Sequence, residues 1–276
     1  MNRFFTENNW RFIDQSLSML TRSPLESFAM DDTLCHVTGH GESSPVIRTW
    51  VHNESVVLGI QDHRLPHIEE GMQLLRDAGY EPIVRNSGGL AVVLDSGVLN
   101  ISLVFKEKEP TSIDTAFGYM VDFVKALFPQ LAEKIEAYEI VGSYCPGTYD
   151  LSINGKKFAG ISQRRMQNGI AVQIYLCIEG NGAKRAQLIR DFYEVSLQGK
   201  ETKFTYPTVV PSVMASIQEL TGTPITVTEV NMRIQRLLFE WDPETALCPL
   251  QDSELTLYAH YLERIFKRNA SLLKES

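Results

Sequence analysis

Long hydrophobic runs are missing from this sequence. Its most apolar stretch, residues 169–178, contains Gln173 and is far shorter than the roughly 20 apolar residues that cross a bilayer. The N-terminal residues MNRFFTENNWRFIDQS are polar where a secretory signal needs an apolar core. From these two features we expect a soluble protein that works in the cytoplasm.

Cysteine is scarce, and the four cysteines show no paired spacing. In a chain of 276 residues this pattern is typical of reduced thiols rather than of a disulfide framework. Cys35 with His36 and His40 could suggest a metal site, but Cys35 and His36 are adjacent on a predicted helix and cannot share one face. We therefore expect no metal. The cysteines are Cys35, Cys145, Cys177 and Cys248.

A basic excess is also missing. The formal net charge is −8, which argues against a nucleic-acid-binding protein. With 43% hydrophobic and 22% charged residues, the composition is that of an ordinary globular protein. The basic residues do cluster once, within ten residues of each other, at Lys156, Lys157, Arg164 and Arg165.

The N-terminal half is predicted to mix helices and strands. Residues 1–40 carry apolar side chains at helical spacing and are predicted to be helical. Two β-branched runs within residues 46–60 predict a hairpin. An amphipathic helix follows Pro66 and ends at Gly79. Residues 80–105 then predict a strand, a glycine turn and two further strands.

The C-terminal half begins with a helix that opens at Thr111 and stops before Pro129. Two Asn-Gly pairs then separate alternating apolar runs within residues 149–178, which predicts a three-stranded meander. After Gly182 the pattern becomes mainly helical. Together the two halves predict an α+β fold, with mixed or antiparallel sheets flanked by helices.

Cys145 is a candidate nucleophile. It lies in the segment GSYCPGTYD, between an apolar run that predicts a strand (residues 137–142) and the first hairpin of the meander. An isolated cysteine is more often a buried structural residue. A nucleophilic cysteine, however, needs an accessible loop and a cation that favours the thiolate, and the first cations after Cys145 are Lys156 and Lys157.

The predicted hairpin separates these two lysines. With Asn154-Gly155 as its turn, Ser152 pairs with Lys157 and Leu151 with Phe158, so Lys156 and Lys157 point to opposite faces. An ammonium about 4 Å from a thiolate contributes about 4 kcal/mol at an effective dielectric of about 20. Gly160, further along the same strand, marks a place where a ligand or another backbone approaches closely. The alternative is that both lysines are solvated residues of an edge strand.

The segment RNSGGLAVVLD is a candidate binding turn. Ser87, Gly88 and Gly89 offer backbone N–H groups and an unobstructed approach, and Arg85 adds a cation. The alternative is an ordinary turn with a surface arginine, because a single Ser-Gly-Gly is a weak motif.

Three separated motifs together resemble one family. PVIRTWVHNESVVLGIQ, RNSGGLAVVLDSGVLN and NGKKFAGISQRR, spanning residues 45–165, are similar in order and spacing to the biotin/lipoate protein ligase superfamily. Lys157 matches the lysine that touches the acyl carbonyl in that family. Val84, Leu90 and Leu94 replace an arginine, a glycine and a histidine of the ATP-using ligases. Cys145 ahead of Lys157 instead resembles the cysteine octanoyltransferases of the superfamily.

The resemblance implies a fold, an activity and a site. It implies a ligase-like catalytic domain over residues 41–225, with an N-terminal helical segment (1–40) and a C-terminal helical extension (226–276). It also implies a protein N-octanoyltransferase in which Cys145 is the nucleophile and Lys157 its activator. The substrate-binding residues implied are Arg85, Ser87, Gly88, Gly89 and Gly160. Leu90 and Val92 are expected in the acyl tunnel.

The resemblance also implies the partners of the reaction. The donor is an octanoyl-lysine of the glycine cleavage system H protein, and the acceptor is a lysine of the lipoyl domains of 2-oxoacid dehydrogenases. No cofactor, nucleic acid or membrane is implied, and Lys156 with Arg164 and Arg165 is a candidate contact for acidic carrier proteins. Three alternatives stay open: an acyl carrier protein as donor, an ATP-dependent lipoate ligase, and a non-catalytic protein that binds lipoyl carriers.

Overall fold

The computed structural model describes residues 3–107 and 111–272. The helices are α1 (Arg3–Thr6), α2 (Pro24–His40), α3 (Ile68–Asp77), α4 (Ile113–Leu127), α5 (Gly182–Leu197), α6 (Ile217–Thr221), α7 (Val227–Trp241) and α8 (Asp252–Leu272). The strands are β1 (Arg11–Gln15), β2 (Val46–Trp50), β3 (Ser55–Leu58), β4 (Glu81–Val84), β5 (Val92–Leu94), β6 (Val98–Lys106), β7 (Glu136–Ala137), β8 (Leu151–Ile153), β9 (Lys156–Met166), β10 (Gly169–Cys177) and β11 (Ala246–Leu247).

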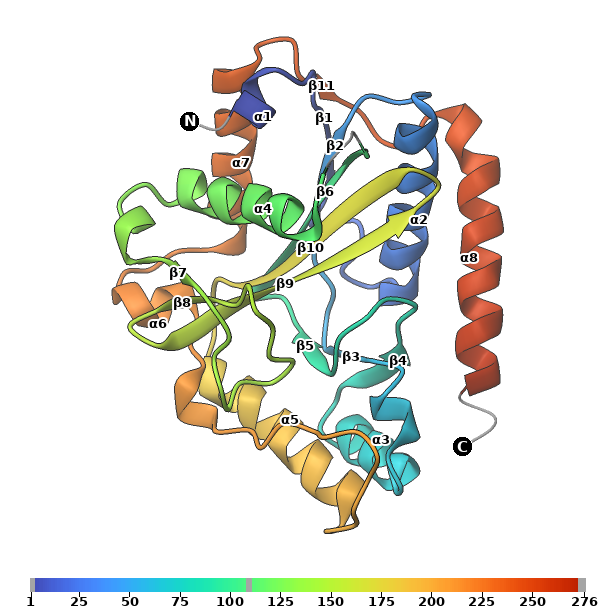
Figure 1. The fold of residues 1–276 in the computed structure, drawn as a ribbon, viewed down its shortest axis with the longest axis vertical. Coiled ribbons are helices and arrows are strands. Elements are labelled where there is room, and N and C mark those ends of the chain that lie inside the picture. The colour runs from blue at the N-terminus through green and yellow to red at the C-terminus, as the bar shows by residue number, and fades with distance from the viewer. Residues whose placement is uncertain (1–2, 108–110, 273–276) are drawn as a thin grey trace.

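The strands form two sheets, a large one and a small one (Figure 1). The large sheet has the order β11-β1-β2-β6-β10-β9-β8-β7, and its centre is antiparallel, from β2 through β6 and β10 to β9. The small sheet has the order β4-β3-β5. With helices covering these mixed sheets, the expected α+β architecture is confirmed.

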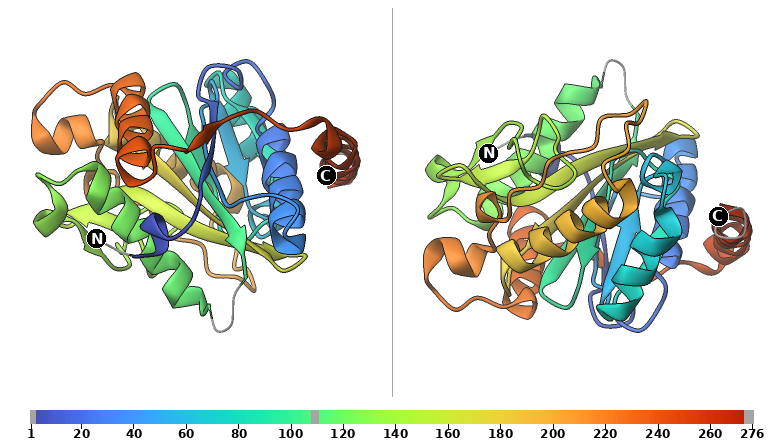
Figure 2. Two further views of the ribbon diagram at one scale, coloured as in Figure 1. Left: turned by 90° about the horizontal axis from the view of Figure 1, so that it is seen from above. Right: turned by 90° about the horizontal axis from the view of Figure 1, so that it is seen from below.

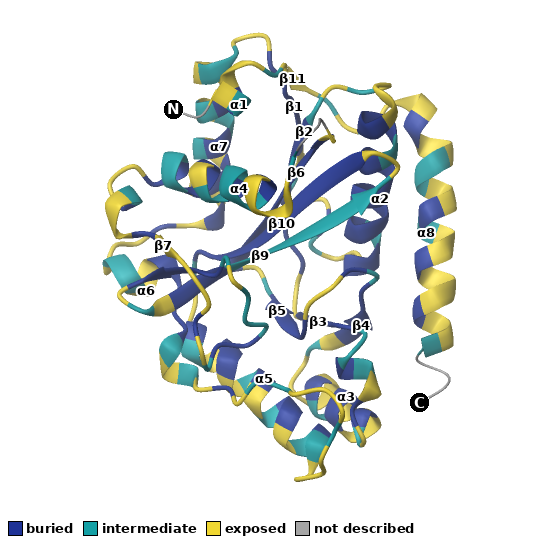
Figure 3. Cartoon of the chain, viewed as in Figure 1, coloured by how far each residue is buried: buried dark blue, intermediate teal, exposed yellow. Residues whose placement is uncertain are grey.

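Helices cover both faces of the large sheet. The strand β10 shows the division, because Ile170, Val172, Ile174 and Leu176 point into a core formed with α4 and α7. The residues between them point to the opposite face, where α2 packs against β6 and β10. Helix α8 lies against the outer side of α2, and Figure 2 shows the chain passing from α7 to α8 across the edge of the sheet. In Figure 3 the outer side of α8 is exposed while β10 is buried.

The small sheet builds a second core beside the first. Its apolar residues pack against α3 and α5, and Tyr144, Tyr175 and Cys177 contribute to the same core from the large-sheet side. Helices α3 and α5 pack against each other below the small sheet (Figure 1). The junction of the two sheets is therefore where the candidate site residues can meet.

Most of the predicted elements are confirmed. The helix after Pro66 is α3, and the helix predicted from Thr111 is α4, whose N-cap is Ser112. The meander is present as β8, β9 and β10, with Ser152 paired to Lys157 as expected. A bulge between Leu151 and Ser152 changes the next pair. Leu151 therefore lies opposite Ala159 rather than Phe158.

Three predictions of secondary structure are wrong. Residues 11–15 are not helical but form β1, which is parallel to β2 and β11. The run 46–60 is not a hairpin, since β2 belongs to the large sheet and β3 to the small one. The strand expected over residues 137–142 ends at Ala137, and the chain then enters a loop. Within the described residues, no helix is long and apolar enough to span a membrane.

Candidate active site

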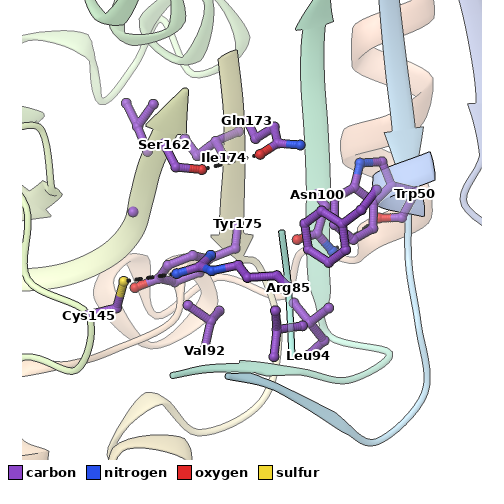
Figure 4. Close-up of a pocket in the computed structure, with 14 residues that line it drawn as sticks. Trp50, Arg85, Val92, Leu94, Asn100, Cys145, Ser162, Gln173, Ile174 and Tyr175 are labelled. Atoms are coloured by element: carbon purple, nitrogen blue, oxygen red, sulfur yellow. Dashed lines mark hydrogen bonds between the residues drawn. The ribbon is translucent and has the colours of Figure 1, made fainter. Parts of the chain in front are cut away.

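Cys145 lies in the loop between β7 and β8, and its backbone is strained. Its φ of 44° falls in the left-handed region that side chains other than glycine rarely occupy. The sulfur accepts a hydrogen bond from the Leu90 backbone N–H at 3.2 Å and lies 3.7 Å from the Arg85 Nη2 donor. Figure 4 shows the Arg85 contact. Two N–H donors aimed at one partly exposed sulfur stabilise negative charge on it.

The glycine turn supplies these donors, as the sequence indicates. Gly89 has a φ of +102°, and a Cβ there would lie 2.1 Å from Arg85 Nη2 and 3.2 Å from the Cys145 sulfur. Arg85 Nη2 also donates to the Leu90 carbonyl at 2.8 Å, so the turn folds around its own arginine. Ser87 is buried, whereas Gly88 is exposed and faces open space. The turn therefore brings Arg85 and Gly89 to the sulfur, and leaves Gly88 away from it.

Lys157 is close to Cys145 but contacts its main chain. The ammonium donates to the carbonyl oxygens of Cys145 at 2.9 Å and Tyr144 at 3.0 Å, and to Ser143 Oγ at 3.2 Å. It also forms an ion pair with Asp150 Oδ1 at 2.8 Å. This differs from the expectation of an ammonium placed directly against the sulfur. The physical reason is the bend of the loop, which turns the Cys145 carbonyl, rather than the thiol, toward β9.

Asp150 is a site residue that the sequence reasoning missed. Both partners of the ion pair are buried, since Lys157 is 0% and Asp150 1% exposed. Burial raises the pKa of Asp150 above its ordinary value, and the Lys157 charge opposes this shift. A signal was available, because a lysine that enters the protein needs a counter-charge. Asp150 is the one acidic residue between Cys145 and Lys157.

Gly160 makes room for a ring rather than for a backbone. It pairs with Tyr175 across β9 and β10, and a Cβ on it would lie 2.5 Å from Tyr175 Cε1. The predicted close approach is thus present, but the neighbour is the phenol ring of Tyr175. Tyr175 itself was not singled out from the sequence, since an aromatic residue in an alternating strand is typical of an ordinary core position.

A pocket opens beside the Cys145 sulfur, with about 510 Å³ of space that includes open solvent at its mouth. Cys145, Arg85, Gly160 and Tyr175 line it, and Figure 4 shows Cys145 on one side and Trp50 on the other. Val92 lies in the wall as expected. Leu90 contributes its backbone N–H to the sulfur and no pocket wall. A narrow apolar pocket beside a thiol suits a linear acyl chain. Its apolar walls are formed by Phe28, Trp50, Val57, Val92 and Leu94.

A buried polar cluster supports the side of the pocket away from Cys145. Arg48 forms an ion pair with Asp31 at 2.7 Å, and Asp31 also accepts from Ser102 and Gln173. Trp50 Nε1 donates to Ser102 Oγ at 3.1 Å, which fixes the indole in the pocket wall. The five residues come from four elements of the chain, α2, β2, β6 and β10, so no local pattern in the sequence indicates them.

The basic cluster is largely neutralised. Arg164 pairs with Asp32 at 2.8 Å and Arg165 with Glu107 at 2.5 Å, whereas Lys156 is exposed on the hairpin. The role of this basic cluster as a contact for carrier proteins stays a prediction. Lys156 is the residue of the cluster whose charge is exposed to solvent. Among the residues that the structure describes, no group of three His, Cys, Asp or Glu side chains is arranged to hold a metal ion.

Comparison with known proteins places this geometry in a family. The model of the lipoyl protein ligase A/B catalytic domain matches residues 23–239. An octanoyl-[GcvH]:protein N-octanoyltransferase of Lysinibacillus sphaericus is 64% identical over 266 residues, covering 96% of each chain. One of Geobacillus kaustophilus is 52% identical, covering 96% of this chain and 94% of that protein.

A solved structure shares the fold. A Thermoplasma acidophilum protein assigned as a lipoate protein ligase, with bound lipoic acid, superposes with a TM-score of 0.69 over 93% of this chain and 95% of its own. Its sequence identity is 16%, so this likeness concerns the fold alone. The family model and the near full-length relatives go further: this chain belongs to the lipoyl protein ligase A/B catalytic domain family.

Proposed function

We propose that this protein moves an octanoyl group between protein lysines in the cytoplasm, through a thioester on Cys145. The donor is the octanoyl-lysine of the glycine cleavage system H protein, and the acceptor is the lysine of lipoyl domains of 2-oxoacid dehydrogenases. One observation carries the proposal: a thiol with two N–H donors on its sulfur stands at an apolar pocket. The names of relatives that are up to 64% identical supply the donor.

The first step is attack on the donor amide. The Cys145 sulfur forms a bond to the octanoyl carbonyl carbon, and the carbonyl electron pair moves onto its oxygen. When that pair returns, the C–N bond breaks and the lysine nitrogen leaves with a proton. The products are the octanoyl thioester of Cys145 and the free H-protein lysine. Splitting one difficult transfer into two acyl steps is the ordinary advantage of covalent catalysis.

The second step repeats the first in reverse with a different amine. The neutral lysine of the lipoyl domain attacks the thioester carbon, the C–S bond breaks, and the attacking nitrogen gives up a proton. One lysine amide is consumed and another is formed. The balance of bonds therefore requires neither ATP nor a redox partner.

The surrounding residues have separate roles in this scheme. Arg85 and the Leu90 N–H stabilise negative charge on the sulfur before attack and after departure. Lys157 holds the Cys145 loop through two carbonyl oxygens. We also assign to it the proton that the leaving nitrogen takes up. Gly89 keeps the space in which sulfur and guanidinium meet. Gly160, which lines the pocket, completes the substrate-binding residues that we assign, whereas Ser87 and Gly88, expected there from the sequence, do not line the pocket.

Intact-protein mass spectrometry tests the proposal. The protein is mixed with octanoylated H protein in the absence of ATP, and we expect an octanoyl adduct that hydroxylamine removes and that maps to Cys145. Cys145→Ala should form no adduct. Cys248→Ala is the matched control, because Cys248 is also partly exposed but does not line the pocket, and it should behave as the unmodified protein does.

Other outcomes would redirect the assignment. An adduct formed from octanoyl-acyl carrier protein, and none from the H protein, would replace the donor. Dependence on ATP and free acid would indicate a ligase. The absence of an adduct with every donor, together with an unreactive Cys145 toward iodoacetamide, would leave a carrier-binding protein and reject the transferase.

A further inference from the structure

Tyr175 places a hydroxyl beside the site for which the free protein offers no partner. The residue is 7% exposed and lines the pocket with Cys145, Arg85 and Gly160. Within the part of the chain that the structure describes, its hydroxyl makes no hydrogen bond. A buried donor or acceptor left in this state costs about 1–3 kcal/mol. Native structures keep few such groups, so this one needs an explanation.

The ring of Tyr175 is held firmly, so its hydroxyl cannot turn elsewhere. Gly160 lies directly against it across the two strands, with a Cβ position 3.1 Å from the phenol oxygen. The Tyr144 ring stacks on it with centroids 5.8 Å apart and an interplanar angle of 28°. The Lys157 ammonium lies 5.8 Å from its centroid. These contacts from β9 and from the Cys145 loop fix the ring and therefore the position of the phenol oxygen.

The ring points toward the side of the pocket that holds the nucleophile. Tyr175 and Cys145 line the same pocket, and Figure 4 shows the Tyr175 ring directed toward its Cys145 side. Burial raises the pKa of Tyr175 well above its ordinary value, and the charges of neighbouring groups, Cys145 among them, raise it further. The group therefore stays protonated at neutral pH. It is a hydrogen-bond donor whose acceptor has to come with the substrate.

The chemistry of acyl transfer supplies such an acceptor. As the sulfur attacks, negative charge develops on the carbonyl oxygen, and preorganised donors at that position lower the barrier. The Leu90 N–H and Arg85 Nη2 already serve the sulfur, whereas the Tyr175 hydroxyl is uncommitted. We propose that Tyr175 is a catalytic residue, whose hydroxyl donates a hydrogen bond to the octanoyl carbonyl oxygen in both transfer steps. This inference rests on the proposed function.

The electron balance leaves Tyr175 unchanged. The C–S bond forms, and the carbonyl pair moves to the oxygen, which accepts the Tyr175 hydrogen bond without taking its proton. The pair then returns and expels the lysine nitrogen, which takes its proton from Lys157. The second step runs through the same tetrahedral arrangement and returns that proton to Lys157.

Tyr175→Phe tests the proposal, because it removes only the oxygen. In single-turnover assays with octanoylated H protein, we expect thioester formation to slow by about 100- to 1,000-fold, the usual effect of losing one oxyanion donor. The donor concentration that gives half the maximal rate should not change. Alkylation of Cys145 by iodoacetamide should not change either, since that reaction develops no carbonyl charge. The melting temperature of the variant should be equal to or higher than that of the unmodified protein, because a buried hydroxyl without a hydrogen bond has been removed.

Tyr144→Phe is the matched control. Tyr144 is fully buried and stacks on Tyr175, and within the described residues its hydroxyl also makes no hydrogen bond, but Tyr144 does not line the pocket. Its removal should leave the thioester rate at the wild-type value. Octanal provides a second probe, because its reversible adduct with a thiol is tetrahedral. Inhibition by octanal should weaken in Tyr175→Phe and persist in Tyr144→Phe.

Each result separates this inference from the proposed function. If the unmodified protein forms no thioester, the proposed function fails. If it does, and Tyr175→Phe forms the thioester at the same rate, the role of Tyr175 is rejected while the transferase stands. Equal losses in alkylation and acylation would place the hydroxyl's effect on the sulfur and would also reject the role at the carbonyl oxygen. Unchanged octanal inhibition in Tyr175→Phe would reject it independently of the acylation rate.

Discussion

At the scale of single residues, a buried ion pair determines the shape of the Cys145 loop. Removing an ammonium and a carboxylate from water costs several kcal/mol each, and only close pairing with further hydrogen bonds offsets that cost. Lys157 and Asp150 meet at 2.8 Å, and the remaining ammonium protons reach the loop's carbonyl oxygens. Asp150 in turn accepts from the Ile140 N–H. The pair therefore holds both ends of the segment that presents Cys145.

Replacing Lys157 by Met should destabilise the fold as well as stop transfer. The change leaves Asp150 buried without its cation, which costs about 3–5 kcal/mol, measured as the free energy of unfolding in urea. Adding Asp150→Asn should recover much of this loss, because the uncompensated charge is removed, but should not recover thioester formation. Lys156→Met is the matched control for stability, since Lys156 is exposed one residue away. A stable, fully active Lys157→Met protein would contradict the assigned role.

A second buried carboxylate, that of Asp62, supports the glycine turn through Gly59, which packs on it. It accepts from the Gly59 N–H at 2.7 Å and from the Tyr193 hydroxyl at 2.8 Å. Gly59 packs so closely on the turn that a Cβ there would lie 1.9 Å from the Gly89 carbonyl oxygen. Burial raises the pKa of Asp62 to about 6, and these hydrogen bonds and the Arg85 charge only partly oppose the shift.

The raised pKa of Asp62 predicts a stability that falls as pH rises. Between about pH 4 and about pH 6 the folded protein holds a proton on Asp62 that the unfolded chain has released, so the free energy of unfolding decreases across this window by about 3 kcal/mol. Above it, the ionised buried carboxylate remains a cost. Asp62→Asn removes this term, so the variant should gain stability relative to wild type as pH rises, measured by urea unfolding at both ends of the window.

The control for Asp62 is Asp77→Asn. Asp77 lies exposed at the end of α3, where a carboxyl group is solvated in both states. This variant should follow the wild-type dependence on pH. If Asp62→Asn also follows it, Asp62 does not titrate in this range and its protonation is not linked to folding.

At the scale of elements, sequence patterns predicted those structures that depend on residues close together in the chain. The Asn-Gly pairs favour positive φ, and Asn154 and Asn168 have φ of 53° and 59°, so the meander β8–β10 was predictable with its main register. The run that contains β2 and β3 was not, because two short apolar strands look the same whether they pair with each other or with other strands. Only packing against β6, or against β4 and β5, decides between these possibilities.

The residues of the candidate site also divide into those that a local sequence pattern indicates and those that depend on tertiary packing. Cys145, Lys157 and the Arg85 turn were predictable, since each belongs to a segment whose composition carries its own signal. The identity of the donors on the sulfur was not, because Leu90 acts through a backbone N–H and its side chain gives no hint of it. The place of the Tyr175 ring depends on Gly160, its partner across β9 and β10, which no local pattern indicates. The division into residues 1–40, 41–225 and 226–276 stays a prediction.

Helix α8 shows how an element distant in sequence supports the site. Its Asn269 accepts the Val84 N–H at 2.8 Å, and Val84 directly precedes Arg85. At its other end, Glu254 forms an ion pair with Arg11 of β1 at 2.7 Å. The helix therefore connects the first strand of the large sheet with the last residue of β4. The backbone that leads into Arg85 is therefore anchored from outside the segment that carries its motif.

At the scale of the whole molecule, the site exists only where the two sheets meet. The turn after β4 brings Arg85 and the Leu90 N–H from the small-sheet side, while β9 and β10 bring Lys157, Gly160 and Tyr175 from the large sheet. Cys145 lies between them on a loop bound to both. This arrangement sets one candidate nucleophile at one apolar pocket, so under the proposed function the donor and acceptor carriers use the same sulfur in turn.

A shared sulfur and an amide-for-amide exchange predict a freely reversible reaction. Because the bond formed is of the same kind as the bond broken, the equilibrium constant between the two octanoylated carriers should lie within about a factor of ten of unity, which corresponds to about 1.4 kcal/mol. Mixtures started from octanoylated H protein and from octanoylated lipoyl domain should converge on one ratio by mass spectrometry, with or without ATP. Cys145→Ala should leave both mixtures as they began. Mixtures that settle at different ratios, or a ratio that ATP shifts, would mean that acyl transfer is driven by a step other than exchange on Cys145.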